Sequence, residues 1–268
     1  MKNSIRPTFA TASIAAAVLG SSAHANFVLD GFGSGAQSVT TASTTSYTSW
    51  ASGSAALAAG SVFGNRQASA IWTTSVQHNG SLTQAQKLAR TAGFTADADA
   101  GLGIFNFGGR VGSAEVGITY NSVPGQWIDF ASLGTGLRLD GALTTLTGAT
   151  NAFFQSISID VRVTDSFGVT ANHTWFANTV TGGFTGLAGA LEADFTAFAP
   201  AYSHQTIDFS SIASLEIELG YSYTGFAVAP TVSGSYELSS VSLIGVPAPG
   251  ALALLGLAGV VGVRRRGR

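Results

Sequence analysis

The chain has 268 residues, of which 46% are apolar, 10% are charged and none is cysteine. This length fits one large domain or two small ones, and the apolar fraction is sufficient for a hydrophobic core. The lack of cysteine excludes a disulfide scaffold, a cysteine-ligated metal site and a thiol nucleophile. The high apolar content and low charge also argue against intrinsic disorder.

The charges are distributed unevenly along the chain. From Asp30 to Glu237 the sequence holds 14 acidic residues and six basic ones, and the other basic residues lie near the two ends. A nucleic-acid-binding protein needs clustered cations to displace counterions from phosphate groups. We therefore expect no nucleic-acid partner.

Residues 1–25 have the three-part pattern of a secretory signal peptide. Lys2 and Arg6 form a cationic start, an apolar stretch follows, and Ala23-His24-Ala25 supplies the small residues that signal peptidase accepts. We expect signal peptidase to act as a partner and to cleave before Asn26. The alternative is an ordinary N-terminal helix.

Residues 26–245 form the body of the protein, and β-strand patterns dominate them. Residues 31–60 are rich in Ser, Thr, Ala and Gly, which predicts either a loose loop or poorly defined edge strands. Four later segments alternate apolar and polar residues with a period of two, which predicts strands with one polar face. These segments are 116–120, 137–139, 156–163 and 215–223.

The last strand of the body changes its hydrophobic phase. Tyr236 and Leu238 share one phase, whereas Val241 and Leu243 share the other. One extra residue resets the phase of a strand, so we predict a β-bulge at Ser239-Ser240. A short helix is predicted within residues 81–90, but one helix does not change the fold class.

The expected fold is all-β: a single antiparallel β-sandwich, jelly-roll-like, over residues 26–245. Strands with one polar face favour antiparallel sheets, because parallel sheets are usually covered on both faces. We find no repeat of 20 to 50 residues that would indicate a solenoid or a propeller. The signal peptide precedes this domain, and a C-terminal hydrophobic segment follows it.

Few residues of the body suggest metal chemistry. His78, His173 and His204 lie far apart in the sequence and lack any known ligand spacing. Asp97 and Asp99 begin a pattern suggestive of a Ca²⁺ loop, but the terminal Glu of an EF-hand is missing. We expect no metal and no cofactor, with a structural calcium ion as the open alternative.

Paired carboxylates leave a carbohydrate-active enzyme as one alternative function. Glycoside hydrolysis needs two carboxylates across a cleft, and residues at i and i+2 in a strand lie about 7 Å apart on one face. The two candidate pairs are Glu192 with Asp194 and Glu216 with Glu218. A solvated strand face explains them equally well, so we expect no enzyme and no catalytic residue.

Tryptophans leave a polysaccharide-binding module as the second alternative, because indole rings stack on sugar rings. The chain has four tryptophans, namely Trp50, Trp72, Trp127 and Trp175. Large aromatic residues of a sandwich are mostly packed in the core, so we expect each of them to be core or partly buried.

The C-terminal segment, residues 246–268, has three parts. A proline motif comes first, and residues 250–263 follow without a polar side chain. Fourteen helical residues span about 21 Å, which is short of the roughly 30 Å hydrocarbon core, so we predict a weak and transient membrane anchor. The basic cluster would hold the end of the chain in the cytoplasm. The motif is Val246, Pro247, Ala248 and Pro249, and the cluster is Arg264, Arg265, Arg266 and Arg268.

These three parts, in this order at the C-terminus, resemble a PEP-CTERM sorting signal. Ala248 stands where the motif of that family usually has Glu. The resemblance implies recognition by exosortase, a membrane protease of Gram-negative bacteria, and removal of the tail on delivery to the cell surface or the extracellular polysaccharide. A plain single-pass anchor is the alternative.

The body is also similar to passenger domains of the PEP-CTERM family, which are often jelly-roll-like sandwiches. The similarity lies in the start at residues 27–32 and in a closing strand that runs directly into the proline motif. The activity of such passenger domains is mostly unassigned. From the two terminal signals, the acidic body of low charge and the lack of a catalytic motif, we expect an exported protein with a non-catalytic structural or adhesive role in a biofilm, where extracellular polysaccharide is the expected partner.

Overall fold

The structure of the protein is a computed structural model, which describes most of the body. The described residues are 26–42, 48–58, 62–73, 83, 90–109, 112–123, 125–147, 155–180, 183–223 and 231–245. The predicted signal peptide, the predicted sorting tail and most of the predicted helix at 81–90 lie outside them. Within these ranges, no helix has the length and apolar character needed to span a bilayer.

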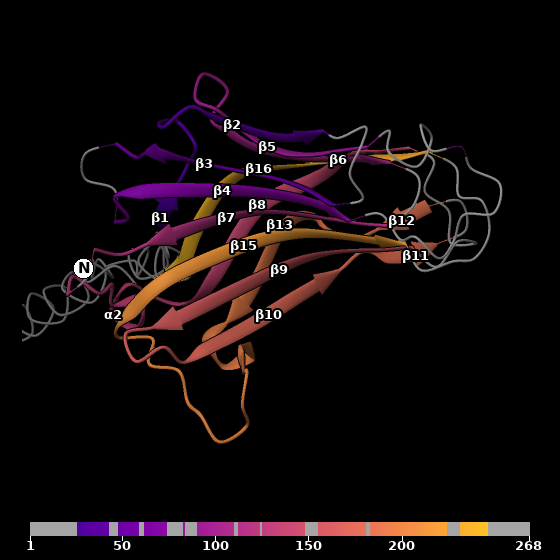
Figure 1. Cartoon of the computed structure of the whole chain (residues 1–268). Helices are drawn as coiled ribbons and strands as arrows, with labels where there is room; N and C mark the ends of the chain where they lie inside the picture. Colours follow the sequence, from indigo (N-terminus) through magenta and orange to yellow (C-terminus); the bar gives the residue numbers. More distant parts are fainter. Residues whose placement is uncertain are drawn as a thin grey trace, which may run out of the picture.

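Nearly all regular structure in the described ranges is β-strand (Figure 1). One helical turn, α2 (Phe130–Leu133), and one 3₁₀ turn, η2 (Phe195–Ala197), interrupt the strands. The strands are β1 (Phe27–Asp30), β2 (Gln37–Ala42), β3 (Thr48–Ala56), β4 (Asn65–Thr73), β5 (Thr91–Asp97), β6 (Leu102–Gly109), β7 (Ser113–Asn121), β8 (Gly134–Thr147), β9 (Gln155–Asp165), β10 (Thr170–Phe176), β11 (Asn178–Val180), β12 (Gly183–Thr185), β13 (Ala188–Asp194), β14 (Ala199–Pro200), β15 (Ile212–Tyr223) and β16 (Val232–Gly245).

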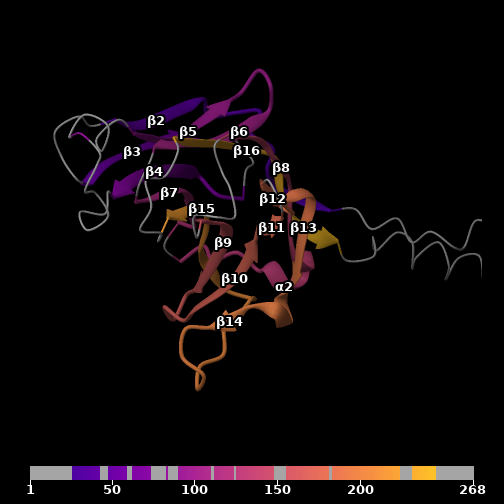
Figure 2. The same ribbon diagram turned by 90° about the vertical axis from the view of Figure 1, so that its right-hand side faces the viewer.

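Fourteen of these strands form two seven-stranded antiparallel sheets, and β11 and β12 pair with each other in a separate two-stranded sheet. The first sheet has the order β13-β8-β16-β6-β5-β2, with β1 paired to β16, and the second has the order β14-β10-β9-β15-β7-β4-β3. In Figures 1 and 2, the strands β2, β5, β6 and β16 lie over β3, β4 and β7. The predicted all-β sandwich is therefore confirmed, whereas its jelly-roll character stays a prediction.

The alternation read from the sequence determines which side chains meet between the sheets. On β15, Leu215, Ile217 and Leu219 are buried in the core, while Glu216 and Glu218 point to the opposite face. Aromatic rings fill the centre of the core, where the rings of Phe107 and Tyr221 stack at 4.7 Å, and several other aromatic pairs surround them. The polar faces predicted for these strands are the outer faces of the sandwich.

The predicted bulge in the last strand is confirmed. The pairing of β16 with β8 shifts register between Leu238 and Ser240, which leaves Ser239 as the extra residue. The hydroxyl of Ser239 donates to the backbone carbonyl of Asp140 at 2.9 Å, and that of Ser240 donates to its carboxylate at 3.0 Å. The bulge thus brings two neighbouring hydroxyl groups to one acidic residue.

The described parts of the Ser- and Thr-rich segment 31–60 include two edge strands, β2 and β3. β2 is the last strand of the first sheet, and β3 is the last strand of the second sheet. The side-chain amide of Gln37 on β2 donates to the backbone carbonyl of Gly53 on β3 at 2.8 Å. This contact links the two sheets at their shared edge.

Candidate functional site

The outer face of the second sheet presents three parallel rows of side chains that cross six strands, from β3 to β10. Five strand spacings of about 4.8 Å make each row about 24 Å long. The central row is Ser52, Ser69, Gly117, Glu218, Asp160 and Thr174. The aromatic row on one side is Trp50, Ile71, Glu115, Gly220, Ser158 and Phe176. The polar row on the other side is Ser54, Gln67, Thr119, Glu216, Arg162 and Asn172.

A shallow cavity of about 470 Å³ lies at the β3–β4–β7 end of this face. Its polar lining comes from Ser52, Ser54, Gln67, Ser69 and Thr119, which carry hydroxyl and amide groups and no charge. The next position in the central row is Gly117, so no side chain stands between this lining and Glu218 on β15. The cavity therefore opens along the central row toward the carboxylates.

Large apolar side chains stand at both ends of the aromatic row. Trp50 on β3 is 72% exposed and Phe176 on β10 is 64% exposed, and Ile71 lies beside Trp50 on β4. Trp50 precedes Ser52 by two residues on the same face of the strand, about 7 Å away, so its indole lies at the rim of the cavity.

Glu218 is the most strongly perturbed carboxyl group of this face. Burial raises the pKa of Glu218 to about 7, and the nearby charges of Glu115, Glu216 and Asp160 add to the shift, while Arg162 opposes it. Glu218 forms no hydrogen bond or ion pair with any residue that the structure describes. With this pKa, the Glu218 carboxyl gains or loses its proton near neutral pH.

The carboxylates beside Glu218 already have partners. Glu216 forms an ion pair of 2.6 Å with Arg162 across the β15–β9 pair. Asp160 accepts hydrogen bonds from the hydroxyl groups of Ser158 and Thr174. Of the two carboxylates of this candidate pair, Glu216 is thus ion-paired with Arg162, and Glu218 has no such partner among the described residues.

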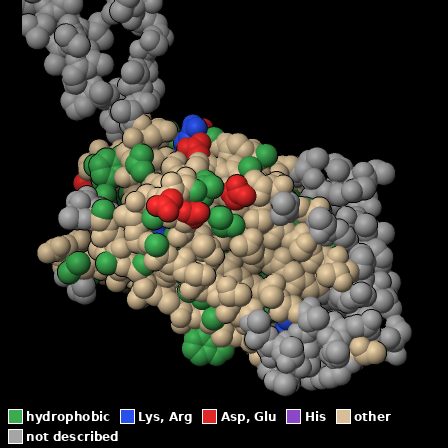
Figure 3. Space-filling model, turned by 90° about the horizontal axis from the view of Figure 1, so that it is seen from above, with side chains coloured by type: hydrophobic (Ala, Val, Ile, Leu, Met, Phe, Trp, Pro, Cys, Tyr) green, Lys and Arg blue, Asp and Glu red, His purple; other side chains and the backbone are tan. Residues whose placement is uncertain are grey.

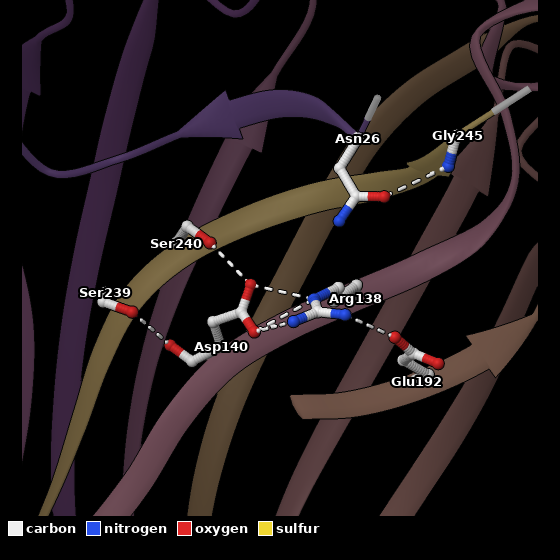
Figure 4. Close-up of polar contacts among 7 residues, drawn as sticks. All are labelled: Asn26, Arg138, Asp140, Glu192, Ser239, Ser240 and Gly245. Atoms are coloured by element: carbon white, nitrogen blue, oxygen red, sulfur yellow. Dashed lines mark hydrogen bonds and ion pairs between the residues drawn. The ribbon is translucent and has the colours of Figure 1, made fainter. Parts of the chain in front are cut away.

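The second candidate carboxylate pair, Glu192 and Asp194, lies on β13 of the other sheet, and Figure 4 shows the contacts of Glu192. Arg138 donates to Glu192 at 2.7 Å and forms an ion pair of 2.6 Å with Asp140. Hydrogen bonds from Arg138 lower the pKa of the Asp140 carboxyl. Asp194 lies at the start of η2 and its side chain caps no backbone group there. Glu192 and Asp194 thus have separate environments.

The outer face of the first sheet offers a second, more open depression. Figure 3 looks onto this side of the molecule, where a few acidic side chains lie among uncharged polar and apolar atoms. The depression is lined in part by Asp140, Thr144 and Glu237, and Thr144 donates to Glu237 at 3.0 Å. Because Arg138 and Asp140 are paired with one another and Glu237 accepts from Thr144, we take the outer face of the second sheet as the candidate site.

The tryptophan prediction is confirmed for two residues and wrong for two. Trp72 is fully buried, and Trp175 is partly buried against the core. Trp50 is exposed because β3 is an edge strand whose even-numbered residues point outward, and Trp127 is 42% exposed in the segment between β7 and α2. We expected burial for all four residues, but no second layer covers the outer face of an edge strand or a connecting segment.

The residues considered for metal binding have other roles in the described ranges. The carboxylate of Asp97 accepts the backbone N–H groups of Asp99 at 3.1 Å and Ala100 at 3.0 Å, so it stabilises the turn between β5 and β6. His173 packs edge-on against Trp175, and His204 is exposed. Among the described residues, no three His, Asp or Glu side chains are grouped so that they could hold a metal ion. His78 lies outside the described residues.

The residues predicted for signal cleavage and sorting are described only at Asn26. Its side-chain carbonyl accepts a hydrogen bond of 3.3 Å from the backbone N–H of Gly245, the last described residue (Figure 4). Ala23, Ala25, the proline motif and the arginine cluster lie outside the described residues.

Comparisons with known proteins place this chain in no family. No family model matches it, and no curated protein matches it. Among solved structures, PfGH50B aligns with 54% of this chain and 20% of its own, at 13% identity and a TM-score of 0.31. The agarase AgWH50C aligns with 54% of this chain and 21% of its own, at 11% identity and a TM-score of 0.31. This chain spans about a fifth of either structure.

Proposed function

We propose that the protein is an exported, non-catalytic surface or matrix protein whose sandwich adheres to extracellular polysaccharide through the outer face of the second sheet. The observation that carries this proposal is the exposed indole of Trp50 at the rim of an uncharged polar cavity. An exposed ring on a rigid strand offers a flat apolar surface at little entropic cost, because its backbone is already ordered.

The chemistry of the cavity supports a sugar as the ligand. Hydroxyl and amide side chains both donate and accept hydrogen bonds, which matches the hydroxyl groups of a carbohydrate. The rows are about 24 Å long and cross the strands without a large side chain in the central row until Glu218. An extended chain suits this shape better than a compact small molecule does.

The experiment that tests adhesion measures binding of the protein to polysaccharide purified from the producing cells. We expect Trp50→Ala to lower the affinity at least about tenfold, a loss typical of an aromatic contact residue. Trp127→Ala is the matched control, because it removes another exposed indole away from the cavity. Equal binding by the wild type and both variants would reject the outer face as the adhesive surface.

We also propose that signal peptidase removes residues 1–25 and that an exosortase-type protease acts at the proline motif. The protein would pass through a membrane-inserted intermediate before it reaches the cell surface or the matrix. Intact-mass analysis of protein from the envelope and the medium tests this. A form from Asn26 to near Pro249 supports it. A membrane form that retains Arg268, or tail removal unchanged by Pro247→Ala with Pro249→Ala, contradicts it.

One observation favours a carbohydrate-active enzyme as a second candidate. A general acid in glycoside hydrolysis has a raised pKa, as Glu218 does. The second carboxylate of that mechanism must be free to act, whereas Glu216 is paired with Arg162 at 2.6 Å. Turnover in a broad screen of glycans, abolished by Glu218→Gln, would establish the enzyme. Binding without turnover supports adhesion.

A further inference from the structure

We propose that the polysaccharide held on the outer face of the second sheet carries protonated amino groups, which bind beside Glu218 and Glu115. This inference rests on the proposed adhesive function and specifies the class of glycan. The surface is an unpartnered sheet face with aromatic side chains at both ends, and its charge determines which glycan it fits.

The charge of this face is negative and largely uncompensated. It presents Glu115 on β7, Asp160 on β9, and Glu216 and Glu218 on β15. Arg162 is its one cation among the described residues, and that guanidinium is already bound to Glu216 at 2.6 Å. An anionic glycan would be repelled here, whereas a cationic one would be attracted.

Glu115 and Glu218 are placed so that one ammonium group can approach both. Gly117 on β7 pairs with Glu218, and Glu115 lies two residues before Gly117 on the same face. Such diagonal neighbours across an antiparallel pair lie about 7–8 Å apart at their Cα atoms. A cation between them contacts two carboxylates with long, adjustable side chains. Gly117 adds no side chain that would block this approach.

The cavity at the β3–β4–β7 end of the face lies close to these two carboxylates. Ser69 pairs with Gly117 on one side, and Gly117 pairs with Glu218 on the other, so two strand spacings of about 4.8 Å separate the cavity lining from the carboxylate. A sugar ring stacked near Trp50 and a later unit of the same glycan chain above Gly117 would bring an amino substituent to Glu218. The aromatic row and the carboxylates thus serve one ligand.

The electrostatics of the unbound face agree with this assignment. The repulsion that Glu218 experiences comes from Glu115, Glu216 and Asp160, with Arg162 as the opposing charge. An ammonium group would relieve that repulsion and would hold Glu218 in its charged form. A neutral or acetylated sugar gives no such relief.

The test compares two oligosaccharides of equal length, one of β-1,4-linked glucosamine and one of its fully N-acetylated form. Binding of each to the full chain is measured by titration calorimetry at pH 6 and at low salt. We expect the amino form to bind at least about tenfold more tightly, and this preference should fall with added salt. Glu218→Gln and Glu115→Gln should each reduce the preference to within about threefold of parity.

The controls separate this inference from the proposed function. Glu192→Gln removes a carboxylate from the other sheet and should leave the preference unchanged. Trp50→Ala should lower the affinity for both oligosaccharides by a similar factor. Equal affinity for the two forms, or a preference that Glu218→Gln leaves intact, would overturn the amino-glycan assignment while adhesion to a neutral glycan still stands.

If no glycan binds in a Trp50-dependent manner, the proposed function itself fails. Equally tight, Trp50-independent binding of polylysine would show a general cation surface and would also overturn the assignment.

Discussion

Arg66 and Asp30 form an ion pair of 2.6 Å in which the side chains are 0% and 4% exposed. The hydroxyl of Tyr120 donates to the same carboxylate oxygen of Asp30 at 2.8 Å. The guanidinium carbon of Arg66 lies 5.1 Å from the ring centroid of Phe32 and 5.6 Å from that of Phe94. The pair therefore joins β1 to β4 and β7 inside the sandwich.

Asp30→Ala is expected to destabilise the fold by about 3–5 kcal/mol, because it leaves the buried guanidinium of Arg66 without its counter-charge. Glu192→Ala removes one partner of the half-exposed Arg138 and should cost less than about 1 kcal/mol. Urea unfolding of both variants checks the difference. Similar losses for the two would contradict the view that burial decides the importance of these ion pairs.

Glu218→Gln is expected to stabilise the protein at alkaline pH and to leave it unchanged at acidic pH. The folded-state pKa of about 7 exceeds the ordinary value of 4.5, so the native state binds the proton more tightly than the unfolded chain does. Stability contributed by the protonated carboxyl is therefore present below about pH 4 and is lost as the pH rises through 7.

The size of this effect is about 1–2 kcal/mol above pH 7, after a discount for solvent screening of a partly exposed group. Melting temperatures of the wild type and Glu218→Gln at pH 4 and pH 8 measure it. A stabilisation of equal size at both values would mean that the charge of Glu218 is not its cause.

Gly109→Ala is expected to cost about 1–3 kcal/mol through overpacking. A Cβ atom at this position would overlap the ring of Trp72, which is fully buried. Gly64→Ala is the matched control, because a Cβ there meets nothing within 4 Å. Thermal unfolding should separate the two variants clearly, and an unchanged Gly109→Ala would show that the core around Trp72 repacks freely.

Trp50→Ala and Trp72→Ala should differ sharply in stability although both delete an indole. Trp72 is fully buried, so its removal leaves a cavity and should cost about 3–5 kcal/mol. Trp50 is largely exposed, so its removal should lower the free energy of unfolding by less than about 1 kcal/mol. Denaturant midpoints of both variants provide the comparison. A large loss for Trp50→Ala would assign it a packing role and weaken its role in adhesion.

Local pattern was sufficient to predict five strands of the sandwich, namely β7, β8, β9, β15 and β16. The period of two in residues 156–163 and 215–223 identified β9 and β15 together with their polar outer faces. The phase change after Leu238 located the bulge at Ser239. These features depend only on neighbours along the chain, which is the information that a single sequence carries.

The features that sequence analysis missed depend on strand pairing. The environment of Glu218 includes Glu115 from β7 and Asp160 from β9, which lie more than fifty residues away in the chain. The ion pair of Asp30 and Arg66 joins residues 36 positions apart in the chain. The sequence has no other charged residue between them, and this was an available signal that the two could be partners. Trp50 is exposed because it lies on the outward-facing side of β3, and the sequence around it has no apolar alternation that shows which side faces the core.

The hydrogen bond between Asn26 and Gly245 has a mechanical consequence. β1 pairs with β16 in antiparallel fashion, with Phe27 opposite Leu243, so the first and last described residues adjoin the same rung. A pulling force between these two residues would load the rungs of this pair one after another, as in peeling, rather than all together in shear. The domain would therefore yield first at its shortest terminal strand, while the face that carries Trp50 and Glu218 stays in the unpeeled sheet.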